Sequence, residues 1–178
     1  MTDQPGTCAA HRATTTSGGY FEDFPVGRKL RHARGATIGE VENNLLTKMV
    51  MNTAQAHWNE DIVPGDHPLG SGRIVFGLIT AAMVFGLASE DTADNAIAEL
   101  GCHKLRFTGP VHHGDSLYAY TEVIAAEPDE AQRAGVVTFQ HWGVDQAGRV
   151  VFRGIRRVLI KAQDWRPLST TPSGGEPV

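Results

Sequence analysis

Cysteine is scarce in this sequence of 178 residues, and a long apolar run is absent. Cys8 and Cys102 lie far apart, with neither a CxxC pair nor a metal-type spacing, so the sequence predicts no disulfide framework and no zinc motif. The most apolar stretch, residues 74–88, is shorter than the roughly 20 residues that span a bilayer. The N-terminus lacks the basic start and apolar run of a secretory signal. We therefore expect a cytoplasmic protein with no membrane partner.

The sequence also lacks an excess of basic charge and the common nucleotide-binding motifs. A formal net charge of −4 and an isoelectric point near 6.0 leave no global basic field that would attract nucleic acid. No GxSxG, P-loop or GxGxxG motif is present. These absences argue against a nucleic-acid-binding protein, a serine hydrolase, an NTPase and a Rossmann enzyme.

The remaining composition is sufficient for one hydrophobic core. Hydrophobic residues make up 41% of a chain whose length is typical of a single domain. Residues 1–19 and 167–178 are rich in Ser, Thr, Gly and Pro, which is the composition of flexible tails. No repeat or long linker divides residues 20–166, so we expect one domain there.

A strand and a helix are predicted at the start of this domain. Residues 29–36 follow turn residues and predict a strand. Thr37 and Glu40 have the spacing of a capping box, and apolar residues follow at helical intervals. A helix is therefore expected to start near Ile38.

The rest of the domain predicts a second helix and a run of strands. Residues 54–72 mix Pro, Gly, Asp and Asn and predict an irregular loop, and residues 77–90 are apolar on nearly every side, which predicts a helix enclosed on all faces. Turn residues then separate four predicted strands, at about 101–109, 115–126, 134–144 and 149–161. This order favours an α+β fold in which a largely antiparallel sheet wraps around a central helix, and the hot-dog fold is its natural candidate.

His57 is the first candidate for catalysis. An imidazole titrates near neutral pH, so it can take a proton from water and return one to carbon within a turnover. A histidine that only packs beside Trp58 is the alternative.

A second candidate site is the segment from Gly72 to Gly77, which leads into the apolar helix. Backbone N–H groups at a helix N-terminus lack intrahelical partners, so the N–H of Gly77 can hold a thioester oxygen as it becomes an enolate. Phe76 is expected to contact substrate beside it. A glycine that only permits close packing is the alternative.

The adjacent residues His112 and His113 suggest a metal site, but we expect none. Neighbouring residues in an extended chain point to opposite faces, and no second His/Cys cluster completes a site. A turn in which Asp115 accepts from the backbone explains the motif.

The chain resembles the MaoC-like dehydratases, relatives of the R-specific enoyl-CoA hydratases, over about residues 20–161. In that family an Asp-x-Asn-Pro-Leu-His motif carries the catalytic Asp and His, and the equivalent stretch here runs from Asn52 to His57. Gly77 matches the glycine whose N–H receives the thioester oxygen, and a Pro-Val-x-x-Gly-Asp turn ends at Asp115. The departure is Asn52, whose amide does not titrate near neutral pH and therefore cannot serve as an acid or base.

Three segments, MNTAQ-x-H, ENNLLT before it and VTFQHWGVDQAG after it, are similar to the sequences of the branch that contains mesaconyl-CoA and itaconyl-CoA hydratases. The resemblance implies a hydro-lyase that acts on a small unsaturated acyl-CoA, with a C5 dicarboxylic substrate favoured. His57 would handle the protons and Asn52 would orient water, although Glu60 or Asp61 is an alternative carboxylate. Arg73 is the candidate partner of the free carboxylate, since a buried charge needs a partner, ahead of Lys104 and Arg106.

The resemblance also implies a homodimer with active sites in the seam between two hot-dog units. It implies no metal and no prosthetic group, with coenzyme A as part of the substrate. Two alternatives remain open on the same fold, an acyl-CoA thioesterase and a non-catalytic acyl-CoA binding protein.

Overall fold

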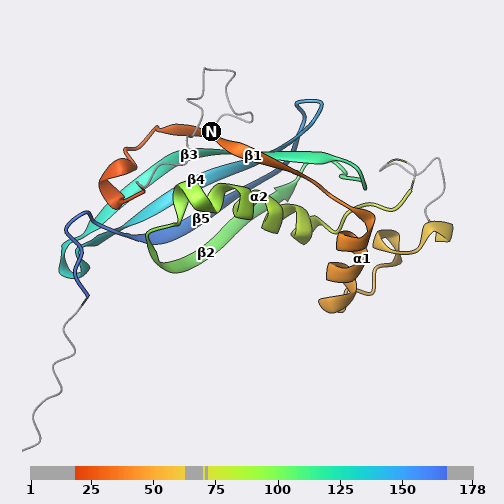
Figure 1. Ribbon diagram of the computed structural model, residues 1–178, viewed down its shortest axis with the longest axis horizontal. Coiled ribbons are helices and arrows are strands. Elements are labelled where there is room, and N and C mark those ends of the chain that lie inside the picture. Colours follow the sequence, from red (N-terminus) through yellow and green to blue (C-terminus); the bar gives the residue numbers. More distant parts are fainter. Residues whose placement is uncertain (1–18, 63–69, 71, 168–178) are drawn as a thin grey trace, which may run out of the picture.

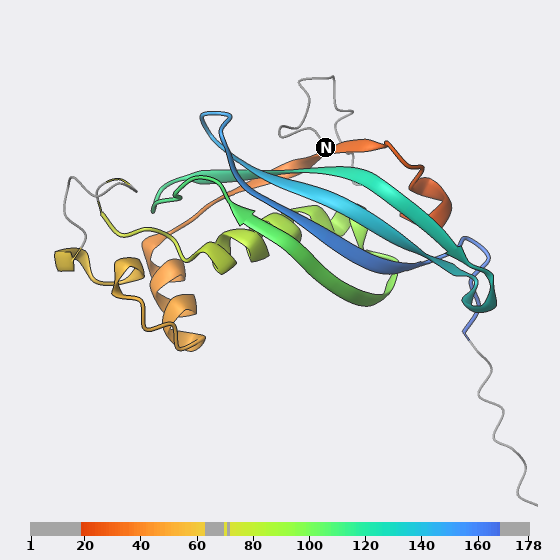
Figure 2. The same ribbon diagram turned by 180° about the vertical axis from the view of Figure 1, so that it is seen from behind.

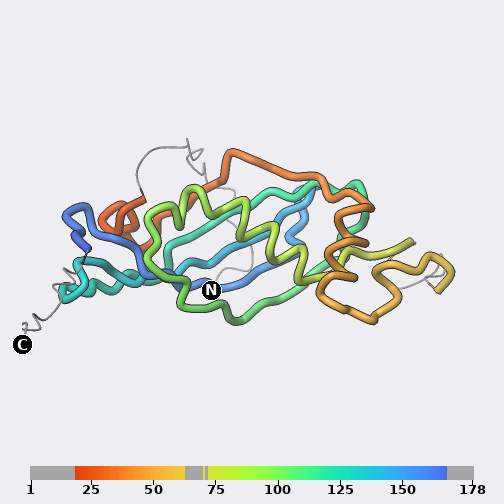
Figure 3. Tube along the Cα trace, turned by 60° about the horizontal axis from the view of Figure 1, so that its bottom comes forward, coloured from red at the N-terminus to blue at the C-terminus, as the bar shows by residue number. Residues whose placement is uncertain are grey.

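The computed structural model describes residues 19–62, 70 and 72–167. An antiparallel sheet of five strands curves around one long helix, and a shorter helix lies at one end (Figures 1 and 3). The predicted tails lie outside the described residues except for Gly19 and Pro167. The elements in chain order are η1 (Phe21–Asp23), β1 (Lys29–Thr37), α1 (Glu40–Met49), η2 (Gln55–His57), η3 (Glu60–Ile62), α2 (Gly77–Thr92), β2 (Ala96–Phe107), β3 (Ser116–Asp129), η4 (Glu130–Gln132), β4 (Ala134–Asp145) and β5 (Val150–Lys161).

The sheet has the order β1-β3-β4-β5-β2, and every neighbouring pair is antiparallel. Strands β3, β4 and β5 form the centre, while β1 and β2 are the edges (Figure 2). The predicted α+β class, the antiparallel sheet and the central helix are confirmed. The predicted strands fall within a few residues of the observed ones, with the largest difference at β2, which begins at Ala96 rather than near residue 101.

Helix α2 packs one apolar side against the sheet. Val84 and Ala88 are fully buried in this contact, together with Phe152 from β5. Gly143 of β4 lies directly beneath, where an added Cβ atom would be only 2.5 Å from the Val84 side chain. The glycine therefore permits the helix to sit close to the sheet. No helix in the described ranges is both long and apolar enough to cross a bilayer.

The prediction that α2 is enclosed on all faces is wrong for this single chain. Leu78 is 52% exposed, and Ala82 and Gly86 are exposed as well. The sheet covers only one side of the helix, so an apolar side remains open to solvent.

Helix α1 begins at Glu40, two residues later than the sequence predicted. Its N-cap is Gly39, whose N–H donates to the Glu42 carboxylate at 2.6 Å. The predicted capping box of Thr37 and Glu40 is wrong because Thr37 is the last residue of β1, where its hydroxyl lies 2.6 Å from that of Ser116. Because Thr37 is held in the sheet, the helix can start only after it.

The amphipathic helix α1 buries its polar side. Asn43 and Thr47 are fully buried, whereas Val41, Leu45 and Met49, which repeat at helical spacing, are 76%, 56% and 69% exposed. The apolar stripe that identifies the helix in the sequence therefore has no partner in the described part of the chain.

A chain of polar side chains crosses the core beside the far half of α2. Asp91 Oδ2 lies 2.6 Å from His32 Nδ1, His32 Nε2 lies 2.7 Å from Thr121 Oγ1, and that hydroxyl lies 2.8 Å from His141 Nδ1. Burial lowers the pKa of His32, against the opposing effect of Asp91, and lowers that of His141 well below 6.5. Both imidazoles are therefore favoured in the neutral form.

Acidification should destabilise the fold through these histidines. Their folded-state pKa values lie below the ordinary 6.5, so the unfolded chain binds more protons and the free energy of unfolding falls as pH drops through 6.5. One histidine contributes a slope of at most about 1.4 kcal/mol per pH unit. Urea unfolding between pH 8 and 5 should show a shallower slope for His141→Gln than for the wild type. His103→Gln, at an exposed histidine of β2, is the control, and an unchanged slope in His141→Gln would contradict the assignment.

Candidate active site

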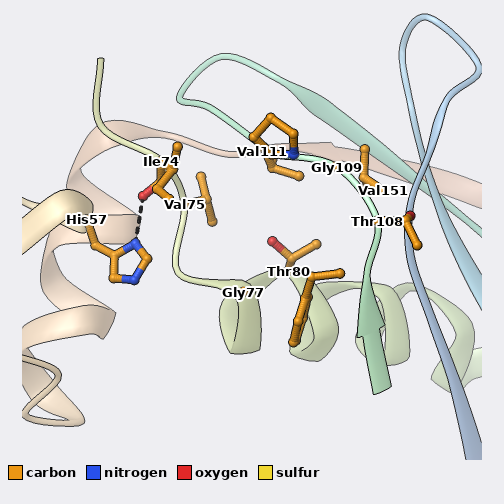
Figure 4. A pocket seen from close by; sticks show the side chains of 11 residues that line it. His57, Ile74, Val75, Gly77, Thr80, Thr108, Gly109, Val111 and Val151 are labelled. Atoms are coloured by element: carbon orange, nitrogen blue, oxygen red, sulfur yellow. Dashed lines mark hydrogen bonds between the residues drawn. The ribbon is translucent and has the colours of Figure 1, made fainter. Parts of the chain in front are cut away.

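A cavity of about 370 Å³ lies where the start of α2 meets the end of β2. His57 lies on one side of it, and Gly77 and Thr80 lie across from it on α2 (Figure 4). We call it the His57 cavity. It is lined by His57, Ile74, Val75, Gly77, Thr80, Phe107, Thr108, Gly109, Pro110, Val111 and Val151.

The imidazole of His57 is held by a backbone carbonyl. His57 ends the short helix η2, and its Nδ1 lies 3.0 Å from the carbonyl oxygen of Ile74 (Figure 4). The N–H of Ile74 in turn donates to the Ala56 carbonyl at 3.2 Å. A carbonyl oxygen only accepts, so in the neutral ring Nδ1 carries the proton and Nε2 keeps a lone pair. His57 is therefore placed as a group that can accept a proton at Nε2.

Gly77 is the first residue of α2 and lines the same cavity. Phe76 precedes it as the N-cap, and no side chain caps the helix. The first N–H groups of a helix have no intrahelical acceptor and carry the positive end of its dipole. An added Cβ atom at Gly77 would lie 3.1 Å from the ring of Phe107, so the small residue also lets β2 approach the helix tip. Both the functional prediction and its packing alternative are consistent with this placement.

The fully buried amide of Asn43 ties these two parts of the site together. Its Nδ2 donates to the carbonyl oxygen of His57 at 2.8 Å, and its Oδ1 accepts from the N–H of Phe76 at 3.1 Å. Nδ2 also lies 3.0 Å from His113 Nε2, and Oδ1 lies 3.4 Å from the Thr47 hydroxyl. Helix α1 thereby fixes the His57 segment relative to the tip of α2.

Arg73 is engaged by two carboxylates beside the cavity. Its guanidinium pairs with Glu40 of α1 and, at 2.5 Å, with Glu60 of η3. The guanidinium lowers the pKa of Glu40, and the two carboxylates raise the pKa of Arg73. Arg73 does not line the His57 cavity. Its predicted contact with a substrate carboxylate stays a prediction.

Asn52 and Phe76 line a second cavity, of about 540 Å³, between α1 and α2. This cavity shares no lining residue with the first. The Oδ1 of Asn52 accepts from the Ala54 N–H at 2.9 Å, and the ring of Phe76 lies 5.3 Å from that of His57. The structure thus brings His57 and Gly77 together at one cavity and places Asn52 at the other. The catalytic role predicted for Asn52 stays a prediction.

The His112–His113 motif forms the predicted turn. Asp115 accepts from the His112 N–H at 2.8 Å. His113 faces Asn43, and burial lowers the pKa of its imidazole. Over residues 19–62, 70 and 72–167, no group of three His, Cys, Asp or Glu side chains is arranged to hold a metal ion.

Two site residues escaped the sequence analysis, Asn43 and Thr80. The four-residue spacing of Asn43 and Thr47 marks a polar stripe on α1, but periodicity assigns the apolar stripe to the core. Thr80 is a polar residue in an apolar helix, which is a weak signal by itself. Only the packing of α1 and α2 gives either residue its place.

The comparisons with known proteins agree on one family. The sequence model of the mesaconyl-CoA hydratase family matches residues 11–162. A β-methylmalyl-CoA dehydratase of Chloroflexus aurantiacus is 33% identical over 153 residues, which are 85% of this chain and 43% of that protein. The chain therefore spans less than half the length of this relative.

Solved structures give the same result. A MaoC-domain dehydratase from Chloroflexus aurantiacus superposes with a TM-score of 0.73 at 31% identity, covering 93% of this chain and 46% of that one. A Mycobacterium tuberculosis protein described as having a double hot-dog fold superposes with a TM-score of 0.68 at 25% identity, covering 86% of this chain and 47% of that one. The predicted hot-dog fold is confirmed.

The contact between His57 and Ile74 makes a spectroscopic prediction. In the neutral ring, long-range ¹H–¹⁵N NMR correlations should show His57 as the tautomer protonated at Nδ1, because the Ile74 carbonyl can only accept. The His57→Gln spectrum assigns the signals. A ring protonated at Nε2 would contradict the geometry and remove the proton acceptor from the site.

Proposed function

Because the chain belongs to the mesaconyl-CoA hydratase family of MaoC-like dehydratases, we propose that it is a hydro-lyase that adds water to, or removes it from, a small unsaturated acyl-CoA. The observation that carries the proposal is the pairing, at one cavity, of a histidine held through Nδ1 with the free N-terminus of a helix. The first group supplies acid–base chemistry and the second supplies stabilisation of an oxyanion.

In the hydration direction, the thioester oxygen binds at the N–H of Gly77. His57 Nε2 takes a proton from water as the water oxygen attacks the β-carbon of the C=C bond. The electron pair moves to the thioester oxygen, and the resulting enolate is stabilised by the helix N-terminus. The imidazolium then returns its proton to the α-carbon, so one water is added and His57 is neutral again. Dehydration is the reverse sequence.

We favour a C5 dicarboxylic enoyl-CoA, mesaconyl-CoA or itaconyl-CoA, as the substrate. The family description names mesaconyl-CoA, and the Chloroflexus relative is named for β-methylmalyl-CoA. Arg73 is the proposed partner of the free carboxylate, and it would have to exchange Glu40 or Glu60 for the substrate. Asn52 stays the proposed residue that orients water, and this role requires its amide to reach the His57 cavity from the second cavity. Coenzyme A enters as part of the substrate, and no further cofactor is proposed.

We also propose that the working form contains two copies of the chain. This chain covers 47% of the double hot-dog protein, which is about one of its two hot-dog units. A second copy of this chain would supply the other unit. Among the described residues the edge strand β2 pairs only with β5, and the open sides of α1 and α2 expose Val41, Leu45 and Leu78. Burying such apolar surface stabilises association. A second copy of the chain would bury this apolar surface without a different protein.

A panel of acyl-CoA esters tests the proposed reaction. The protein is incubated with mesaconyl-, itaconyl- and crotonyl-CoA while mass and free thiol are followed. We expect one ester, preferentially a C5 dicarboxylic one, to gain 18 mass units (one H₂O). Release of free thiol would instead identify a thioesterase, and neither change would identify an acyl-CoA binding protein.

Replacement of His57 tests the assigned acid–base group. His57→Gln should lower kcat by about 10²- to 10⁴-fold, because glutamine does not titrate. Its urea midpoint and oligomeric state should stay close to those of the wild type, since the side chain is only partly buried. The control His103→Gln should keep the wild-type rate. A His57→Gln enzyme with near-normal kcat would remove His57 from the mechanism.

A further inference from the structure

The hydroxyl of Thr80 opens into the His57 cavity and has no hydrogen-bond partner among the described residues. Thr80 lies in the first turns of α2 and is 2% exposed. Its backbone N–H is bonded to the Phe76 carbonyl, but in the part of the chain that the structure describes nothing forms a hydrogen bond with its Oγ1. Figure 4 shows this oxygen turned from the helix into the His57 cavity, toward the side where Val75 and Val111 lie.

Two other threonines, one in the same helix and one at the same cavity, bond to backbone carbonyls. Thr92, in the same helix, donates to the Ala88 carbonyl at 2.7 Å. Thr108, which lines the same cavity, donates to the Val150 carbonyl at 2.6 Å. The Thr80 oxygen is not sealed from the cavity, so it can form a hydrogen bond with a ligand oxygen. The Thr80 hydroxyl is therefore available for recognition in a way that the other two are not.

The rest of the cavity provides few other donors. Its lining is mainly Val, Ile, Phe, Pro and Gly, and it includes no Lys or Arg. Besides the Thr80 hydroxyl, the donors considered are the imidazole of His57 and the N–H groups at the helix tip, since the Thr108 hydroxyl already donates to the Val150 carbonyl. Both are already assigned to the water and the thioester. A polar group elsewhere on the acyl chain would meet Thr80.

The position of Thr80 suits the distal end of the acyl group. Residues three apart lie on the same side of a helix, and the rise of 1.5 Å per residue places Thr80 about 4.5 Å along the axis from Gly77. A ligand whose thioester oxygen lies at Gly77 can place its β-substituent along α2 beside Thr80, because both residues line the same cavity. In mesaconyl-CoA that substituent is the free carboxylate. Thr80 would donate to one of its oxygens, and Arg73 would have to leave Glu40 or Glu60 to neutralise its charge.

We infer that Thr80 is a specificity residue, whose hydroxyl donates a hydrogen bond to an oxygen at the distal end of the acyl group. The inference rests on the proposed function and deepens it, because it assigns a residue to the recognition of the oxygenated acyl group rather than to the chemical step. Loss of a donor in an apolar site weakens binding of a ligand that needs it and leaves a ligand without the oxygen unaffected.

Two esters of matched shape test the inference. Mesaconyl-CoA, esterified at the carboxyl group next to the methyl-bearing carbon, carries a carboxylate where tiglyl-CoA carries a methyl group. Thr80→Val should lower kcat/KM for mesaconyl-CoA by about 10- to 100-fold, while the value for tiglyl-CoA changes by less than about 2-fold. Thr80→Ser, which keeps the hydroxyl, should retain most of the mesaconyl-CoA activity. Where an ester is not turned over, its Ki as a competitor replaces kcat/KM.

Thr92→Val is the matched control, because it removes a hydroxyl from the same helix outside the cavity lining. Thermal unfolding verifies each variant, and Thr80→Ala replaces Thr80→Val if the latter fails to fold. An equal loss on both esters would assign Thr80 to water or thioester binding and overturn the inference, as would no loss on either. A wild-type protein that hydrates no enoyl-CoA in the panel would instead overturn the proposed function, and the inference with it.

Discussion

The side-chain amide of Asn43 donates to the carbonyl oxygen of His57 and accepts from the N–H of Phe76, so one group joins three segments. Its removal would leave a carbonyl and an N–H without this partner, at a cost of about 1–3 kcal/mol for each group that stays unsatisfied. The distance between the imidazole and the tip of α2 depends on these two bonds. The Ile74 carbonyl then fixes the ring itself through Nδ1.

This constraint explains why α1 turns its polar side inward. Asn43 and Thr47 must face the His57 segment, and at helical spacing Val41, Leu45 and Met49 are then directed to solvent. A helix oriented by its apolar stripe would bury that stripe and lose the amide contacts. The exposed stripe is the structural consequence, and it gives the proposed second copy an apolar surface to cover.

The two polar networks of the domain have different consequences. The chain from Asp91 through His32 and Thr121 to His141 is buried under the far half of α2, and it makes the stability of the fold sensitive to acid. The Arg73 pairs with Glu40 and Glu60 join α1 to the segment after η2 near the surface. Ion pairs with exposed carboxylates contribute little to stability, so this second network connects segments without adding much to the free energy of unfolding.

Much of the domain could be predicted from the sequence, because the signals were local. The apolar segment 77–90 specifies a helix, and the four alternating segments after it specify strands. Turn residues separate the strands. The start of α1 could not be predicted, because Thr37 lies in β1 and contacts Ser116 instead of capping the helix. The family resemblance rested on the spacing of His57 after Asn52, the glycine at the helix entry and the turn that ends at Asp115 taken together. The sequence could also nominate His57 and Gly77 as candidate residues.

Only the tertiary structure decided which candidates share a cavity. It brought His57, Gly77 and Thr80 together and placed Asn52 on the other side of Phe76. The reason is that a sequence pattern records which side of an element is apolar but not what that side faces. In α1 the polar side faces the interior, because the Asn43 amide bonds to His57 and Phe76 on two other segments.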